Sequence, residues 1–295
     1  MENEKRQKRK LSDLSLIDDY LFGLFVQEAK NDEIIKGMIE RMLDIKLSKV
    51  TVKQKQHDVS NEPDLHGIRL DAFIQDDLNT LYDIEVQAVN KNNIPKRMRY
   101  YQSLIDREQM PSGEYDYGKL PKTIIIFVTD FDLFEKGLYR YTFENTCIEN
   151  NAITLGDGSI KVVLNTKGTD RTGVKEELIE LLEYFHSSTK ETANRSSSGF
   201  IKKLDEMLAK IKNNPEFGGE YMSYQEAMYT ERKTGWQEGM QEGMQKGIQK
   251  GMQKGIQKGR QEGIQEGKAE ERALFEKRLR DMGMPENEIK KIMTY

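Results

Sequence analysis

Two acidic residues in neighbouring predicted strands are the strongest candidates for chemistry. Residues 67–75 (GIRLDAFIQ) and 81–88 (LYDIEVQA) alternate polar and apolar positions, and residues 76–80 between them have the composition of a hairpin loop. If the apolar faces of the two strands coincide, Asp71 and Glu85 project from the same side of the hairpin. Both are flanked by apolar residues, and a carboxylate near the core is costly unless it is paired or binds a metal.

Two carboxylates a few ångströms apart suit a divalent cation. Mg²⁺ prefers hard oxygen ligands and keeps several waters, so Asp71, Glu85 and the main-chain carbonyl of Val86 could serve as its protein ligands. A cation held there can polarise a phosphate and lower the pKa of a bound water, which is the chemistry of phosphodiester hydrolysis. The ordinary alternative is an exposed acidic face of an antiparallel sheet, and Asp83, which shares that face, needs no role.

Composition limits the other function classes. The chain has one cysteine, Cys147, which excludes an intrachain disulfide and a thiolate zinc site, and we expect this residue to be a small buried hydrophobe. No two of the three histidines (His57, His66 and His186) have metal-ligand spacing on a helix. With 46 basic and 50 acidic residues the formal net charge is −4, so any nucleic acid must be met by a local patch.

Composition and hydropathy predict a protein that is not embedded in a membrane. Hydrophobic residues make up 36% of the 295 residues and charged residues 33%, so part of the chain cannot build a core. No stretch of 18 apolar residues occurs, and no apolar run follows the basic N-terminus, which predicts a cytoplasmic protein without a membrane partner.

The elements that must position the acids follow from periodicity. Residues 11–166 predict the order αα–βββ–α–βββ, in which residues 123–131 (TIIIFVTDF) form a central strand buried on both faces. The remaining predicted elements are helices at 14–30, 33–45, 96–110 and 174–189, strands at 50–59, 138–145 and 160–166, and helical segments at 200–233 with breaks at 214–215 and 218–219.

Five segments in this order resemble the Rpn family of recombination-promoting nucleases, also described as transposases of the PD-(D/E)XK type. The segments are Asp19-Tyr20-Leu21-Phe22, Arg69-Leu70-Asp71, Ile84-Glu85-Val86-Gln87, Lys96-Arg97-Met98-Arg99-Tyr100-Tyr101-Gln102 and Ile125-Ile126-Phe127-Val128-Thr129-Asp130-Phe131. The resemblance covers about residues 11–170. It implies an α/β restriction-endonuclease-like core, with a central mixed sheet flanked by helices, and Mg²⁺-dependent cleavage of DNA, with Mn²⁺ as an alternative ion.

The resemblance also implies roles for particular residues. Asp71 would be the first acid of the family motif and Glu85 the second, and both would be metal ligands. Asp19, with Asp18 as its rival, would complete the acid cluster from the first helix. Position 87 is Gln where the broader superfamily has Lys, so Gln87 can bind a water but adds no positive charge.

Several basic side chains could supply the positive charge that the motif lysine would bring. These are Lys53, Lys55, Arg97 and Arg99, and the sequence does not choose among them. We expect the same four residues, with Tyr101, to contact DNA. Arg97 and Tyr101 are four residues apart and share a helical face, although Tyr101 packed in the core beside an extended Arg97 explains the spacing equally well.

Nine glycines recur every four residues from Gly235 to Gly267. On an α-helix this period drifts by about 40° per repeat, so the apolar residues that follow the glycines wind slowly around the helix and favour right-handed pairing. Each glycine costs about 1 kcal/mol relative to alanine, which makes a lone helix doubtful. The repeat is therefore either a self-association helix, giving a homo-oligomer, or a semi-flexible spacer.

The predicted organisation has five parts. They are a basic flexible arm (1–10), a PD-(D/E)XK-like nuclease domain (11–170), a helical region (171–233), the glycine repeat (234–268) and a C-terminal helical pair (269–295). The leading hypothesis is a Mg²⁺-dependent DNA endonuclease. The alternative is a catalytically weak or inactive DNA-binding or scaffold protein derived from a nuclease, and Gln87 is the residue that favours it.

Overall fold

The computed structural model describes residues 9–29, 32–59 and 68–294, with the side chains of residues 32, 53–59, 68 and 69 outside the description. Most of the predicted basic arm therefore lies outside the described residues. Contacts divide the chain into two units, Met1–Met222 and Ser223–Tyr295.

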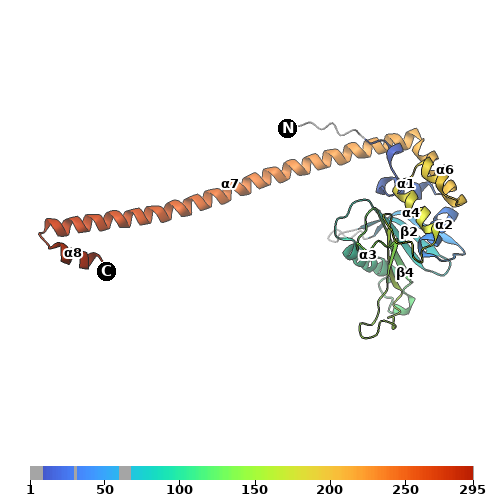
Figure 1. The fold of residues 1–295 in the computed structure, drawn as a ribbon, viewed down its shortest axis with the longest axis horizontal. Coiled ribbons are helices and arrows are strands. Elements are labelled where there is room, and N and C mark those ends of the chain that lie inside the picture. Colours follow the sequence, from blue (N-terminus) through green and yellow to red (C-terminus); the bar gives the residue numbers. More distant parts are fainter. Residues whose placement is uncertain (1–8, 30–31, 60–67, 295) are drawn as a thin grey trace. The chain divides into compact units, whose positions relative to one another are not determined.

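A six-stranded mixed sheet forms the centre of the first unit (Figure 1). Its strand order is β1-β2-β3-β4-β6-β5, in which β3, β4 and β6 are parallel and the remaining pairs are antiparallel. The strands are β1 (Val50–Val59), β2 (Ile68–Asp76), β3 (Leu81–Gln87), β4 (Thr123–Thr129), β5 (Arg140–Phe143) and β6 (Ser159–Asn165). The predicted α/β core with a central mixed sheet is confirmed.

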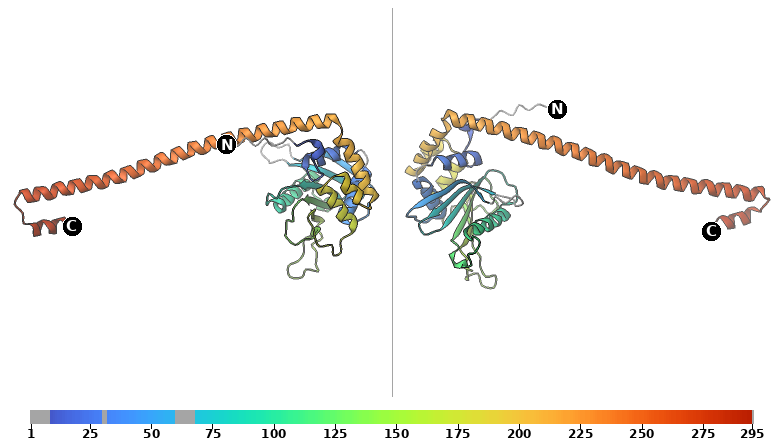
Figure 2. Two further views of the ribbon diagram at one scale, coloured as in Figure 1. Left: turned by 45° about the horizontal axis from the view of Figure 1, so that its top comes forward. Right: turned by 180° about the vertical axis from the view of Figure 1, so that it is seen from behind.

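Helices cover both faces of this sheet (Figure 2). On one face α3 (Ile94–Gln109), which joins the parallel strands β3 and β4, packs on Phe73, Ile125 and Phe127. On the other face the apolar residues of the same strands, with Ile84 and Ile126 at the centre, meet four helices: α1 (Asp19–Glu28), α2 (Asp32–Leu43), α4 (Glu176–His186) and α6 (Gly199–Lys212). The strand β4 is buried along its whole length, as its continuous apolar sequence predicts.

Besides α3, the α-helices that lie wholly in the first unit are α1 (Asp19–Glu28), α2 (Asp32–Leu43), α4 (Glu176–His186), α5 (Lys190–Arg195) and α6 (Gly199–Lys212). These helices begin and end close to their predicted positions, with two exceptions. The first helix starts at Asp19 and not near residue 14, because the main-chain N–H groups of Leu16 and Ile17 donate to Ser188 Oγ and Phe185 O instead of entering a helix. The short helix α5 was not predicted, and Thr189 caps its N-terminus.

Two further expectations were wrong. Cys147 is half-buried and not buried, because it lies in the exposed hairpin that connects β5 and β6. The Gly218-Gly219 pair does not break the helical region, since α7 runs from Pro215 to Asp281 without interruption. The predicted break at residues 214–215 is real and separates α6 from α7.

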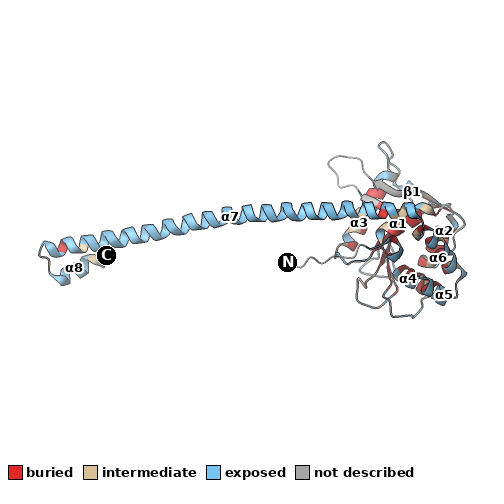
Figure 3. Ribbon diagram, turned by 90° about the horizontal axis from the view of Figure 1, so that it is seen from above, coloured by how far each residue is buried: buried red, intermediate tan, exposed pale blue. Residues whose placement is uncertain are grey.

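The glycine repeat is helical. It lies within α7, and α8 (Glu286–Met293) follows after a turn at Gly283, which has a positive φ. The part of α7 that carries the repeat is exposed along its length (Figure 3). Among the described residues, no helix has the length and apolar character needed to cross a membrane.

Candidate active site

Asp71 and Glu85 meet at a fork where β2 and β3 separate. The antiparallel ladder pairs Phe73 with Asp83 and ends at the pair Ala72–Ile84. Beyond it the carboxylates take the place of main-chain acceptors: the Asp71 N–H donates to Glu85 Oε1 at 3.0 Å, and the Val86 N–H donates to Asp71 Oδ2 at 3.3 Å. The fork therefore fixes the two acids against each other through the main chain of the opposite strand.

Arg97 reaches the same fork from the first turns of α3. Its Nη2 lies 3.0 Å from Glu85 Oε2 and 2.7 Å from the Tyr101 hydroxyl, and its Nη1 donates to Gln87 Oε1 at 2.6 Å. The guanidinium also stands over the rings of Tyr101 and Phe127, at 5.2 and 5.0 Å from their centroids. One planar cation thus binds the second acid and the residue at the motif-lysine position together.

Gln87 is held by its own hydrogen bonds. Its Oε1 accepts from Arg97, and its Nε2 donates to the carbonyl of Val89 at 2.8 Å. With both ends of the amide engaged, the side chain orients Arg97. Of Arg97 and Arg99, the two candidate cations whose side chains the structure describes, Arg97 contacts Gln87.

The acidic face of β3 packs against α3 and is not exposed. Asp83, Glu85 and Gln87 retain 0%, 2% and 7% of their accessible surface. Burial raises the pKa of Glu85 well above its usual range, and the neighbouring carboxylates of Asp83 and Asp71 raise it further. Burial likewise raises the pKa of Asp83, with the charge of Asp71 second.

Asp83 is the most unusual residue of this face. Both of its carboxylate oxygens are buried and have no hydrogen-bond partner among the described residues. When ionised, Asp83 and Glu85 place two buried negative charges close to the guanidinium of Arg97, which contacts Glu85 directly. A bound cation would offset part of this negative charge.

An open cleft of about 330 Å³ lies over the fork. Asp71, Glu85, Gln87 and Arg97 line one side, and Asp18 and Asp19 at the start of α1 line another. Burial raises the pKa of Asp18, with the charge of Asp19 second. The cleft is also lined by Lys91, in the loop before α3, which our sequence reasoning did not single out.

The remaining predicted residues are distributed as follows. Tyr101 is 7% exposed and packs in the core beneath Arg97, and burial with the charge of Glu85 raises the pKa of its hydroxyl to about 12. Arg99 is exposed and does not line the cleft. Lys53 and Lys55 belong to β1, but their side chains lie outside the description.

The donor set at the fork fits a hard divalent cation only with help from water and substrate. Within the described part of the chain, no three His, Cys, Asp or Glu side chains are grouped to hold a metal. Two carboxylates, Asp71 and Glu85, face each other, with the main chain of Val86 between them. Mg²⁺ is commonly bound by one or two carboxylates together with waters and a substrate phosphate, so these residues suit it.

Replacing Asp83 by Asn is expected to stabilise the fold and weaken cation binding. The substitution removes a buried ionisable group without a partner, so we expect a gain of about 1–3 kcal/mol in the free energy of unfolding near pH 8. The gain should shrink as the pH falls towards 5, because the raised pKa of Asp83 favours the neutral carboxyl in the folded chain.

Urea unfolding at the two pH values measures this effect, and Mg²⁺ titration measures the affinity. The exposed Asp77 on the same hairpin gives the matched control, Asp77→Asn. An Asp83→Asn protein less stable than wild type at pH 8 would contradict the assignment of Asp83 as an unpaired buried charge.

Two facing carboxylates beside Arg97, at a fork between two strands of a mixed sheet, are a donor set that a divalent cation could use. Residues 16–233 match the model of a protein family described as "PD-(D/E)XK nuclease family transposase". The chain therefore belongs to this family, and the match extends through α4 to α6 into the start of α7. No curated protein and no solved structure matched the chain.

Proposed function

We propose that this protein is a Mg²⁺-dependent DNA endonuclease of the recombination-promoting type. The observation that carries the proposal is the fork, where Asp71 and Glu85 are fixed by reciprocal hydrogen bonds to the opposite strand and Arg97 is held at Gln87. In this proposal Asp71, Glu85 and the carbonyl of Val86 bind the cation, which supplies polarisation of the scissile phosphate and activation of water.

The other residues of the cleft have distinct proposed roles. Arg97 supplies the positive charge that a motif lysine would bring, and it stabilises charge that develops on the phosphate. Gln87 and Tyr101 orient Arg97 through its Nη1 and Nη2 atoms. Asp19 or Asp18 adds a further acid from the start of α1, and Lys91, which also lines the cleft, contacts the nucleic acid backbone in this proposal.

The experiment is incubation of supercoiled plasmid DNA with the full chain in Mg²⁺, in Mn²⁺ and in EDTA. We expect nicked or linear product with either metal and none in EDTA. Absence of cleavage with every metal and DNA tested would favour the alternative of a nuclease-derived binding protein, in which the cleft binds DNA without cutting it.

We also propose that the glycine repeat of α7 is a self-association helix. Apart from its chain neighbours and the adjacent backbone of α7, a Cβ added at any of the nine glycines would meet no described atom within 4 Å, so no contact among the described residues requires glycine there. The residues that follow most of these glycines are large and apolar, with exposures from 51% at Ile264 to 66% at Trp236. A second copy of the same helix would cover these residues and approach closely at the glycines.

Exchange of Met244, Ile248 and Met252 for Gln in the full chain tests this proposal. We expect a lower molar mass by light scattering, because the exchange removes about half of the apolar stripe. The control exchanges Gln245, Gln249 and Gln253 for Ala, which leaves the stripe intact. An unchanged mass in both variants would contradict self-association through the repeat.

A further inference from the structure

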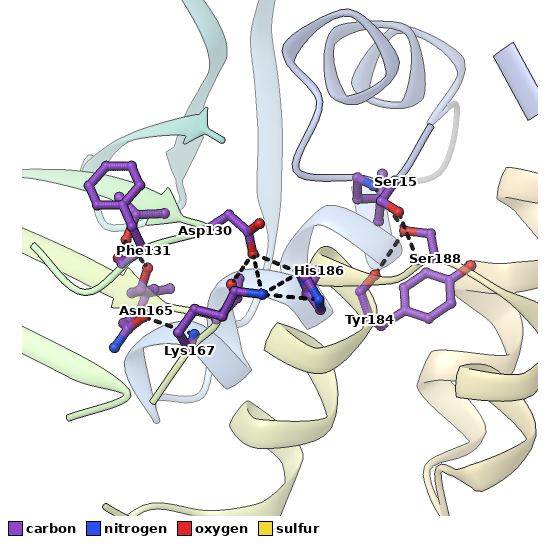
Figure 4. A network of polar contacts seen from close by, with 12 residues as sticks. Ser15, Asp130, Phe131, Asn165, Lys167, Tyr184, His186 and Ser188 are labelled. Atoms are coloured by element: carbon purple, nitrogen blue, oxygen red, sulfur yellow. Dashed lines mark hydrogen bonds and ion pairs between the residues drawn. The ribbon is translucent and has the colours of Figure 1, made fainter. Parts of the chain in front are cut away.

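A second group of charged side chains meets where β4 and β6 end, outside the residues that line the cleft (Figure 4). His186 Nδ1 lies 2.7 Å and Lys167 Nζ 3.4 Å from the same oxygen, Asp130 Oδ1. Lys167 Nζ is also 3.1 Å from both ring nitrogens of His186. The three residues come from separate elements, so the group exists only in the folded chain.

The main chain fixes the position of this group. Asp130 directly follows β4 and its N–H donates to the carbonyl of Gln87 at 3.1 Å, while the hydroxyl of Thr166 donates to Asp130 Oδ1 at 2.6 Å. Lys167 is held by its N–H, which donates to Asn165 Oδ1 at 2.8 Å. These bonds fix the position of Asp130 at the carboxyl end of the central strand β4.

Two links show that the group lies beside the cleft. Gln87, which lines the cleft, is bonded to Asp130, and Ile17, which also lines it, donates its N–H to the carbonyl of Phe185, the neighbour of His186. The strands β3, β4 and β6 are adjacent in the sheet. With about 4.8 Å between neighbouring strands, the end of β6 lies about 10 Å from the end of β3.

The charges favour an anionic ligand. Lys167 and His186 are each 44% exposed, whereas Asp130 is 22% exposed beneath them. Asp130 thus orients Lys167 and His186, and both of these side chains are accessible to a ligand. A cation would be repelled by the Lys167 ammonium, but a phosphate can accept hydrogen bonds from Lys167 and, when both ring nitrogens carry protons, from His186 Nε2.

We propose that Lys167 and His186 form a second phosphate-binding subsite for the nucleic acid backbone. This inference rests on the proposed nuclease function, because the subsite contacts a phosphate of the strand whose scissile phosphate lies in the cleft. Asp130 is a positioning residue in this subsite. It aligns the two donors and partly offsets their charge.

The test measures binding of a fluorescein-labelled DNA duplex by anisotropy in EDTA at several salt concentrations. For Lys167→Gln we expect weaker binding and a decrease of about 1 in the magnitude of the slope of log K against log salt. For Asp130→Asn we expect the opposite, tighter binding, because an acid beside the phosphate is removed while an acceptor oxygen remains. Lys203→Gln, at an exposed site on α6, is the charge-matched control.

The opposite signs separate the subsite from a structural role. If Lys167 and Asp130 only fastened α4 to the sheet, both substitutions would lower the melting temperature and both would weaken binding, which would overturn the subsite. Equal slopes for Lys167→Gln and Lys203→Gln would also overturn it, and His186→Gln repeats the comparison if Lys167→Gln does not fold. If the subsite is overturned but the wild-type protein still cuts plasmid DNA, the proposed nuclease function stands. If the wild-type protein neither binds nor cuts DNA, both the nuclease function and the subsite are contradicted.

Discussion

Replacement of Asp71 by Asn or of Glu85 by Gln is expected to lower metal-dependent DNA cleavage by about 10²–10³-fold or more. The reason is that the cation contributes several kcal/mol to stabilisation of the transition state, and each 1.4 kcal/mol corresponds to a factor of ten in rate. Both substitutions keep the shape of the side chain and an acceptor oxygen for the main-chain N–H that each carboxylate binds across the fork. The loss should therefore appear mainly in catalysis, while Glu85→Gln also gives up the acceptor that Oε2 offers to Arg97.

Rates of plasmid cleavage and thermal melting of the same samples measure the two effects separately. Glu85 is buried beside two other acids, so Glu85→Gln should not lower the melting temperature substantially. Asp77→Asn, on the exposed turn of the hairpin, should cleave at the wild-type rate. Wild-type cleavage by either fork variant would remove Asp71 and Glu85 from the proposed mechanism.

The second large effect is expected at Arg97. Arg97→Gln should reduce cleavage by about 10²-fold at saturating DNA, because it removes a cation that is preorganised beside the two acids of the fork. The substitution should also destabilise the fold by about 1–3 kcal/mol, since the buried Glu85 and the Gln87 amide lose a partner. Because the Arg97 side chain is 28% exposed, we expect this destabilisation to be smaller than that caused by breaking a fully buried ion pair.

A lysine at position 87 tests whether charge at this point is what matters. We expect Gln87→Lys to restore most of the activity in the Arg97→Gln background, since the new ammonium is placed where the Arg97 guanidinium now binds. Arg99→Gln, on the exposed side of the same helix, should affect KM more than kcat. A double variant as inactive as Arg97→Gln, but equally folded, would contradict the assignment of Arg97 as the replacement cation.

The fork could be predicted because its signal is local. Period-two alternation and a short loop are enough to pair Asp71 with Glu85, and the motif order identifies the same two residues. The role of Asp83 could not be predicted, because alternation shows which residues share a face but not what covers it. The packing of α3 on that face makes Asp83 a buried acid.

Contacts between distant segments were beyond sequence reasoning. Helical periodicity places Arg97 and Tyr101 on one face of α3, but only the packing of α3 on the sheet shows that this face meets Glu85 and Gln87. Asp130 and His186 are 56 positions apart and were not connected by any motif. The start of α1 was misplaced for the same reason, because the partners of Leu16 and Ile17 lie some 170 residues away, at Ser188 and Phe185.

The glycine repeat shows where a local propensity rule is incomplete. Nine glycines at about 1 kcal/mol each argue against an isolated helix, yet the repeat lies in the helix α7. Pairs such as Glu242–Lys246 and Lys258–Glu262 at four-residue spacing oppose this cost only slightly. The further stabilisation that this helix needs is consistent with the proposal that a second copy of the helix covers the apolar stripe.

Binding of Mn²⁺, a spectroscopically visible substitute for Mg²⁺, followed by electron paramagnetic resonance, tests directly whether the fork holds a cation. We expect saturable binding to the wild-type chain, competition by Mg²⁺, and loss of this binding in Asp71→Asn and Glu85→Gln but not in Asp77→Asn. Binding of Mn²⁺ to both fork variants with wild-type affinity would show that Asp71 and Glu85 do not hold the cation.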